Sequence, residues 1–182
     1  YTVVVTDDHG CTAGLSVTIT EPDALSLSEQ HINETCNESN NGSINLGIMG
    51  GTTPYTVAWS NGASVPDIDN LSAGNYTVVV TDANGCSGTL TVAITQPDIL
   101  ALSSQVTDVA CNGGNTGAID LTVTGGTGAY SYGWSNGAST EDLSGLAAGT
   151  YTVVVSDANN CSATTSATVN EASALNVSTQ VI

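Results

Sequence analysis

The sequence contains no lysine and no arginine, so its surface has almost no positive charge to present. Seventeen aspartate and glutamate residues give the 182-residue chain a formal net charge of −17. Such a chain repels phosphate backbones and lacks the basic patch that holds a protein to an anionic membrane surface. It also lacks an apolar run long enough to cross a bilayer. We therefore expect no nucleic-acid partner and no direct membrane insertion.

Helical periodicity is absent as well. No segment repeats its apolar residues with the 3.6-residue period of an amphipathic helix. Only 9% of the residues are charged, and Val, Ile, Leu, Thr, Gly, Ser and Asn dominate the rest. This mixture is typical of short strands joined by turns. The composition therefore predicts an all-β fold.

A 75-residue repeat is the main feature of the sequence. The near-copies YTVVVTDDHGC, YTVVVTDANGC and YTVVVSDANNC begin at Tyr1, Tyr76 and Tyr151. Trp59 and Trp134 open matching WSNGAS stretches in the same register. Because no insertion interrupts this register, we interpret the chain as an excerpt of a longer tandem array, in which each unit contacts mainly its neighbours.

The repeat boundaries are predicted from turn chemistry. Pro22 and Pro97 stand where strand patterns give way to turns, and proline cannot donate a hydrogen bond to a strand ladder. We expect the C-terminal part of a preceding repeat, two complete repeats and the first strand of a following repeat, in the ranges 1–22, 23–97, 98–172 and 173–182.

Each repeat is predicted to be an immunoglobulin-like β-sandwich. Short runs rich in β-branched residues are bounded by Gly, Asn, Asp or Pro. The resulting fold class is all-β, with tandem immunoglobulin-like β-sandwich repeats of about 75 residues. In the first complete repeat the candidate strands are residues 24–30, 42–49, 55–60, 75–81 and 87–95, with 64–70 as one more. The segments 71–76 and 146–151 have the Leu-Gly-Tyr spacing of a tyrosine corner.

Alternation along the strands indicates which side chains face the core. Val78 and Val80 fall on one face of a strand and Val79 on the other. We expect the first pair to pack inward with Trp59, and Trp134 to take the same place in the next repeat. Exposed tryptophans would instead form a platform for glycan binding.

Five cysteines without a metal-type CxxC pair predict disulfides and an oxidising, extracytoplasmic compartment. The preferred pairing closes one bridge per repeat, Cys36 with Cys86 and Cys111 with Cys161, and leaves Cys11 to pair outside the sequence. A rival pairing joins Cys11 to Cys36 and Cys86 to Cys111, so that Cys161 is single. If the first and last strands of a repeat are parallel, the preferred bridge requires the loop before Cys36 to double back.

No cofactor is predicted, and calcium is the metal ion for which oxygen ligands abound. Asp7, Asp82 and Asp157 stand in hairpin turns, where an aspartate caps its own backbone. That structural role is the simpler interpretation of these residues. The weak calcium candidates are Asp23, Asp82, Asp98 and Asp157.

No catalytic motif accompanies these features. A GxSxG elbow, an HExxH pair and a glycine-rich phosphate loop are all missing. His9 and His31 do not recur, because Asn84 and Val106 occupy the matching positions of the next repeat. We therefore predict that the protein is not an enzyme.

Several motifs together resemble a known family. The SprB repeat of the giant cell-surface, gliding-motility adhesins of Bacteroidota is similar over essentially the entire chain. The most specific elements here are Gly50-Gly51, Pro54-Tyr55, Trp59-Ser60, Leu71 to Val80 and Asp82 to Cys86, repeated from Gly125 with Ala129 in the place of Pro54.

The resemblance implies a cell-surface protein at the outer membrane, exported by the type IX secretion system. Its repeat arrays would project adhesive elements for attachment, and in gliding relatives they are pulled along by the motility machinery. The main partners would be neighbouring repeats of the same chain. Two other classes stay open: a module that binds surface glycans by multivalency, and a structural filament subunit.

Overall fold

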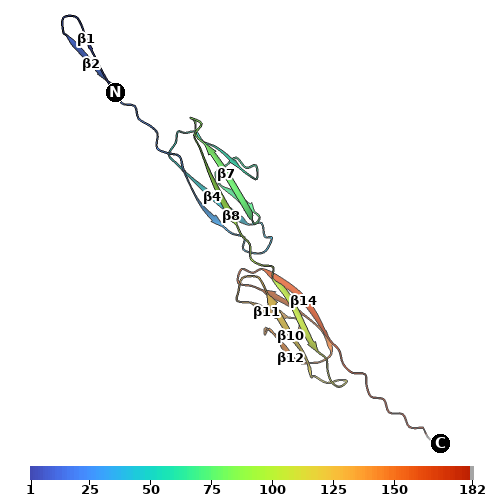
Figure 1. The fold of residues 1–182 in the computed structure, drawn as a ribbon. Helices are drawn as coiled ribbons and strands as arrows, with labels where there is room; N and C mark the ends of the chain where they lie inside the picture. Colours follow the sequence, from blue (N-terminus) through green and yellow to red (C-terminus); the bar gives the residue numbers. More distant parts are fainter. Residues whose placement is uncertain (181–182) are drawn as a thin grey trace. The chain divides into compact units, whose positions relative to one another are not determined.

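The computed structural model describes residues 1–180, which form fourteen β-strands and no helix (Figure 1). The predicted all-β fold is confirmed. Within the described range there is accordingly no helix that could cross a membrane. The first two strands, β1 (Thr2–Thr6) and β2 (Thr12–Ser16), pair with each other as an antiparallel hairpin.

The next six strands form two three-stranded sheets. Their orders are β3-β4-β6 and β5-β7-β8. The β6 strand overlaps the additional candidate segment 64–70 and ends one residue beyond it. The bounds are β3 (Ser26–Ile32), β4 (Gly42–Met49), β5 (Thr56–Trp59), β6 (Ile68–Leu71), β7 (Gly74–Thr81) and β8 (Ser87–Ile94).

The last six strands repeat this pattern 75 residues later. The sheet orders are β9-β10-β12 and β11-β13-β14, and all of their pairings are antiparallel. Two such sheets packed face to face make an immunoglobulin-like β-sandwich. The bounds are β9 (Ala101–Thr107), β10 (Gly117–Thr124), β11 (Ser131–Trp134), β12 (Leu143–Leu146), β13 (Gly149–Ser156) and β14 (Ser162–Val169).

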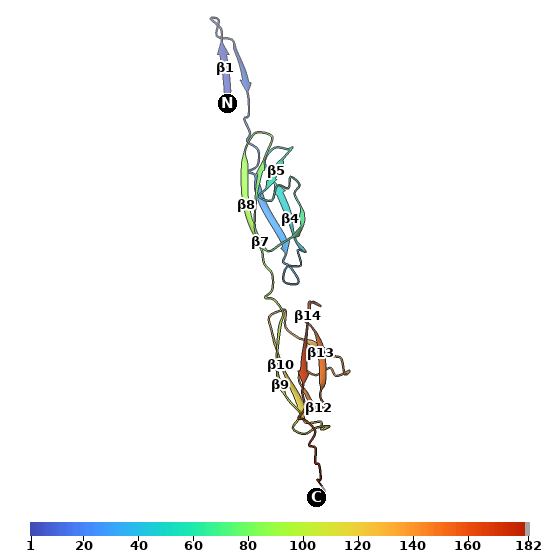
Figure 2. The same ribbon diagram turned by 90° about the vertical axis from the view of Figure 1, so that its right-hand side faces the viewer.

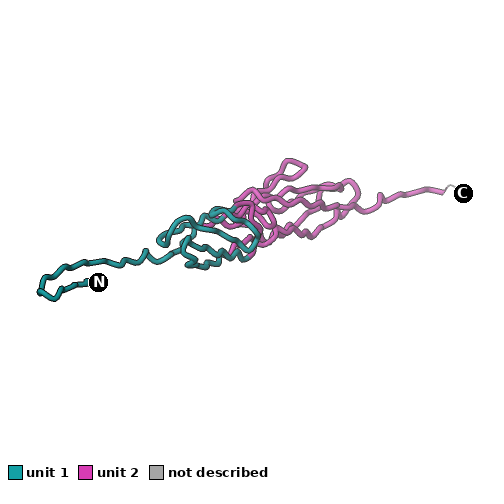
Figure 3. The backbone as a smooth tube through the Cα atoms, turned by 90° about the horizontal axis from the view of Figure 1, so that it is seen from above, with its two compact units in different colours: residues 1–30, 44–68, 75–92 teal, residues 31–43, 69–74, 93–182 magenta. Residues whose placement is uncertain are grey.

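The described chain divides into two compact units, shown in different colours in Figure 3. Unit 1 consists of residues 1–30, 44–68 and 75–92. Unit 2 consists of residues 31–43 and 69–74 together with the chain from residue 93 onward. Two segments of the first complete repeat therefore pack with the second. The repeat boundaries given above stay a prediction.

The core of unit 2 lies between its two sheets, with β13 and β14 on one side and β9 and β10 on the other (Figure 2). Alternation along β13 is complete, because Val153 and Val155 are fully buried whereas Val154 is 44% exposed. The same parity holds in β7, where Val78 and Val80 are fully buried. The predicted inward set is thus confirmed.

Both tryptophans belong to the buried core. Trp59 and Trp134 are only 4% and 5% exposed. Their indole N–H groups donate to the carbonyls of Val65 at 3.0 Å and Thr140 at 2.9 Å, as a buried indole requires. The core prediction is confirmed, and these tryptophans do not form a glycan platform.

A tyrosine corner is present in unit 2. The hydroxyl of Tyr151 donates to the carbonyl of Ala147 at 3.0 Å, four residues upstream. A second tyrosine has a related role, because the Tyr130 hydroxyl donates to the Gly125 carbonyl at 2.6 Å. Sequence spacing predicted the first of these bonds and not the second.

The glycine pair after β10 is required by a close backbone approach. Gly125 has a φ of 73°, and a Cβ built on it would lie 2.0 Å from the carbonyl oxygen of Ile99. The N–H of Gly126 donates to the carbonyl of Asp98 at 2.9 Å, which holds the incoming chain against this turn. Any side chain at Gly125 would push that chain away.

We predict that Gly125→Ala destabilises the protein by roughly 2–5 kcal/mol, because it adds a steric clash to an unfavourable backbone conformation. Gly137→Ala is the matched control. Gly137 also has a positive φ, 86°, but a Cβ there meets nothing within 4 Å. Gly137→Ala should therefore lower the free energy of unfolding only by the cost of the positive φ, about 1–2 kcal/mol. Urea unfolding of both variants measures the difference, and equal losses would contradict the proposed clash.

Candidate functional site

The loop after β3 runs alongside the segment that follows β8. The N–H of Glu34 donates to the carbonyl of Thr95 at 3.0 Å, and the N–H of Thr95 donates to Asn33 Oδ1 at 2.9 Å. Asn37 Nδ2 then reaches the carbonyl of Pro97 at 3.1 Å. These bonds fix the loop beside residues 95–97.

The corresponding loop after β9 makes the same contacts. The N–H of Val109 donates to the carbonyl of Asn170 at 2.8 Å, and Val109 forms a parallel β-bridge with Glu171. Asn112 Nδ2 donates to the carbonyl of Ala172 at 3.2 Å. The first and last strands of this repeat therefore run parallel, and the loop continues beyond the end of the first.

The other half of the site is the hairpin turn between β13 and β14, which Asp157 organises. Its Oδ1 accepts the N–H groups of Asn159 and Cys161, both at 2.9 Å, and its Oδ2 accepts the N–H of Thr127 at 2.8 Å. Asp157 is 5% exposed. Burial acts to raise the pKa of this carboxyl, but the three N–H donors together outweigh it and leave the pKa below the usual value.

Asp82 organises the hairpin turn between β7 and β8 in the same way. Its carboxylate accepts the N–H groups of Thr52 at 2.9 Å, Cys86 at 2.8 Å and Asn84 at 2.9 Å. The Thr52 bond is the largest cause that lowers the pKa of Asp82. Asp7 likewise accepts the N–H of Cys11 at 2.8 Å. The predicted capping role is thus observed in all three turns.

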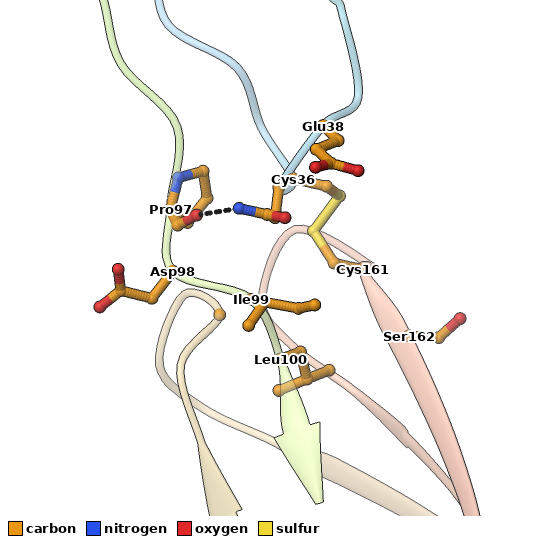
Figure 4. Close-up of a pocket in the computed structure, with 10 residues that line it drawn as sticks. Cys36, Glu38, Pro97, Asp98, Ile99, Leu100, Cys161 and Ser162 are labelled. Carbon is orange, nitrogen blue, oxygen red and sulfur yellow. Dashed lines mark hydrogen bonds between the residues drawn. A yellow bond between two sulfur atoms is a disulfide. The ribbon is translucent and has the colours of Figure 1, made fainter. Parts of the chain in front are cut away.

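A disulfide joins the loop to a hairpin turn. Cys36 is bonded to Cys161, with a Cα–Cα distance of 5.6 Å and 125 residues between them in sequence (Figure 4). Asn159 adds a direct contact, because its Nδ2 donates to the carbonyl of Thr35 at 2.9 Å. A hollow beside the bond is lined by residues 36–38, 97–100, Gly126, Cys161 and Ser162. All of these residues belong to unit 2.

This bond corrects the predicted disulfides. Cys36 is not joined to Cys86, and Cys111 is not joined to Cys161; Cys11, Cys86 and Cys111 are exposed free thiols. The rival pairing, Cys11 with Cys36 and Cys86 with Cys111, is not formed either. The first scheme paired the loop and turn cysteines of one repeat, and the rival paired a turn cysteine with the loop cysteine of the next repeat. The structure instead pairs the loop cysteine of one repeat with the turn cysteine of the next.

The physical reason lies in the path of the second repeat. Cys161 immediately precedes β14, whereas the loop with Cys111 contacts Glu171 and Ala172, just after β14. Eight residues of strand at about 3.3 Å each put roughly 26 Å between these two ends. A disulfide needs Cα atoms about 4.4–6.8 Å apart, so a bridge within one repeat is excluded.

The two remaining repeat cysteines lie in hollows that match parts of the bonded site. Cys111 lines one with Asn112 and residues 172–175, which correspond to Asn37 and residues 97–100. Cys86 lines another with residues 22–25 and Asp82, which correspond to residues 97–100 and Asp157. The hollow at Cys111 is lined by loop residues but by no hairpin turn. The hollow at Cys86 is lined by hairpin-turn residues but by no loop of the type that carries Cys36.

The other two calcium candidates, Asp23 and Asp98, make backbone hydrogen bonds that hold turns in place. The backbone carbonyls of Asp23 and Asp98 accept the N–H groups of Gly51 at 2.7 Å and Gly126 at 2.9 Å. In Figure 4 the Asp98 side chain points away from the disulfide. Calcium binding by Asp23, Asp82, Asp98 and Asp157 stays a prediction.

Comparison with known proteins places this site in a family. Residues 31–64 and 103–139 each match the family model of the SprB repeat. Two regions of the chain thus match the SprB repeat, as the sequence resemblance predicted. Each matched segment contains a loop cysteine, Cys36 or Cys111, so the loop half of the site belongs to the SprB motif. Such repeats indicate an extracellular, adhesin-type protein of the cell surface and a family that is generally non-enzymatic. No curated protein matches the chain in sequence.

Solved structures with similar folds are immunoglobulin-domain proteins. The N-terminal eight Ig domains of Down Syndrome Cell Adhesion Molecule align over 95% of this chain and 28% of that one, at 12% identity and a TM-score of 0.49. The amphioxus IgVJ-C2 molecule aligns over 83% and 98%, at 14% identity and a TM-score of 0.33. The Dpr11 IG1 complex with DIP-gamma IG+IG2 aligns over 79% and 98%, at 12% identity and a TM-score of 0.32.

We predict that Asp157→Asn lowers the urea midpoint at pH 7. Because the folded-state pKa of Asp157 is depressed, its stabilisation is complete above the unfolded value of about 3.9 and is lost as the pH falls through the folded value. The difference from the wild type should therefore shrink toward pH 3. Asp120→Asn, at an exposed strand position, removes the same charge and is the control. Equal midpoints for the two variants at pH 7 would refute the role of the turn.

Proposed function

We propose that this chain is part of the stalk of a large cell-surface adhesin, in which disulfides join successive SprB repeats. The array projects adhesive elements for surface attachment. Export by type IX secretion, anchorage at the outer membrane and use in gliding motility belong to the same proposal, because they follow from the SprB resemblance. The Cys36–Cys161 bond is the observation that carries the mechanical part of this proposal.

The 75-residue register allows the same pairing to recur along the array. The Cys36–Cys161 bond links the loop cysteine of one repeat to the turn cysteine 125 residues later, in the next repeat. With a 75-residue register, Cys111 then bonds the turn cysteine of a following repeat. Cys86 bonds the loop cysteine of a preceding one. This series accounts for the hollows at Cys111 and Cys86. Each of them contains one half of the bonded site, and the partner cysteine of a neighbouring repeat would supply the other half.

Such bonds limit how far the array can be stretched. Tension entering at Cys36 can cross directly to Cys161, so the bond bypasses the 125-residue segment between them. From the turn cysteine Cys161, the chain continues to the next loop cysteine, where the next bond begins. The equivalent segment within this sequence runs from Cys86 to Cys111. That segment is 25 residues long and spans at most about 90 Å when fully extended. The array would thus resist unravelling even if single repeats unfolded.

The charge of the chain supports an extended stalk. A net charge of −17 with no lysine or arginine makes every surface repel its neighbours. Parallel arrays on a cell would therefore stay separate and projecting. The alternative of a glycan-binding module has less support, since Trp59 and Trp134 are buried.

Single-molecule stretching of the full chain tests the load path. We predict that reduction of the Cys36–Cys161 bond adds about 440 Å of contour length, which is 125 residues at about 3.5 Å each. Cys36→Ser should show this longer contour without reductant. If the oxidised and reduced chains reach the same length, the bond does not carry tension and the stalk mechanism fails.

Cross-linking between copies tests the serial bonding. One chain keeps Cys111 as its single free thiol (Cys11→Ser, Cys86→Ser), and the other keeps Cys86 (Cys11→Ser, Cys111→Ser). With oxidised glutathione, the two thiols give up two electrons and two protons, one disulfide forms, and two reduced glutathiones are released. We predict a Cys111–Cys86 dimer in at least fivefold excess over either homodimer on non-reducing gels.

The control for this experiment uses the asparagine of the turn. Asn84 corresponds to Asn159, which donates to the carbonyl beside the bonded loop cysteine. Asn84→Ala in the Cys86 chain should therefore lower the dimer yield, whereas Asn45→Ala, at an exposed position of β4, should not. Random proportions of the three dimers would show that the thiols meet without a specific docking surface and would overturn the serial bonding.

A further inference from the structure

A buried carboxylate with no partner marks a second site in unit 2. Glu34 is 5% exposed, and neither of its carboxylate oxygens has a hydrogen-bond partner among the described residues. Buried polar atoms are nearly always hydrogen-bonded, and an exception calls for a missing water or ion. An ionised carboxylate without compensation is especially costly in such a place.

Within the described residues, the protein brings no positively charged side chain into hydrogen-bonding contact with this carboxylate. It contains no lysine or arginine, and no donor among the described residues, either histidine included, is hydrogen-bonded to the Glu34 carboxylate, so a compensating positive charge would come from solution. The surroundings of the side chain indicate which cation from solution would fit.

Glu34 lines a hollow at the end of the first sandwich with four other oxygen-bearing side chains. They are Glu38, Asn40, Ser72 and Gln96, and Ala73 completes the lining. Carboxylate, amide and hydroxyl oxygens are the ligands that Ca²⁺ takes, in numbers of six to eight when waters complete the set. Mg²⁺ requires a stricter octahedron and gives up its waters reluctantly.

Hydrogen bonds hold this rim together. Ser72 Oγ donates to Asn40 Oδ1 at 2.6 Å, and Asn40 Nδ2 donates to the carbonyl of Glu38 at 3.1 Å. The N–H of Glu38 donates to Gln96 Oε1 at 2.8 Å. Each amide oxygen keeps a second lone pair for another partner. The ligand oxygens are therefore oriented while the two carboxylates are left available.

The second repeat provides an internal comparison. At the positions of Glu34, Glu38 and Ser72 it has residues that offer no side-chain oxygen, and the matching loop packs on an apolar core. Glu38 moreover has a φ of 56° where the second repeat has a glycine, so a glutamate is kept at a position that favours glycine. The counterparts are Val109, Gly113 and Ala147.

We propose that this hollow binds one Ca²⁺, with Glu34 as the central ligand. The ion neutralises the buried carboxylate and ties the loop that carries Cys36 to the segments at residues 72 and 96. Two carboxylates and a solvent-reached rim fit the affinity of extracellular modules, with a dissociation constant on the order of 10⁻⁴ to 10⁻³ M. This inference is independent of the serial disulfides.

Calorimetric titration of the chelator-treated full chain tests the site. We expect one Ca²⁺ per chain, weaker binding of Mg²⁺, and a thermal unfolding midpoint that rises with Ca²⁺. Glu34→Gln and Glu34→Val should each weaken Ca²⁺ binding at least tenfold. Glu34→Val places the residue of the second repeat at this position, so it should fold without the ion.

The matched control is Asp8→Asn, because Asp7, Asp8 and His9 form an exposed cluster of potential metal ligands in the described part of the chain. It should leave the binding unchanged. Loss of binding in Asp8→Asn, or unaltered binding in Glu34→Val, would overturn the proposal. So would a wild-type chain whose unfolding midpoint does not change in about 10 mM Ca²⁺, a concentration tenfold above the largest dissociation constant expected.

Discussion

The pairing of the loop after the first strand with the segment after the last strand is the contact on which the rest of the structure depends. In the second repeat it is the bond from the Val109 N–H to the Asn170 carbonyl, and in the first it is the bond from Glu34 to Thr95. This pairing carries the loop past the end of the sandwich. The loop cysteine therefore lies where the next repeat begins, a full strand length from the turn cysteine of its own repeat.

A chain without lysine or arginine must satisfy its buried carboxylates in another way, and Asp82 and Asp157 do so with backbone N–H groups. Asp82 and Asp157 each accept three such donors and thereby shape the turns that present Cys86 and Cys161. Charge-assisted bonds of this kind are stronger than neutral ones. Glu34 departs from this pattern, since it is buried and has no donor, which is why its surroundings point to an ion from solution.

The sequence was sufficient for the features that depend on local pattern. Strand alternation predicted the burial of Val78 and Val80, and recurrence predicted the tryptophan core. The disulfide could not be derived in this way, because it depends on where a loop goes after its strand ends, and no local propensity encodes that direction. Glu34 had a readable signal that was overlooked: an acidic residue at the position where the other repeat has Val109, in the core.

The choice of an inter-repeat bond over an intra-repeat bond is not explained by stability. Loop-closure entropy grows slowly with length, so closing 125 residues rather than the 50 between Cys36 and Cys86 is worth only about 0.8 kcal/mol more. The two bonds differ more in the path along which they transmit tension. A bond within one repeat would reinforce that sandwich and leave residues 95–100 as a bare single-chain link. The Cys36–Cys161 bond lies beside this link and spans it, so tension has a second covalent path where a chain of separate domains would be weakest.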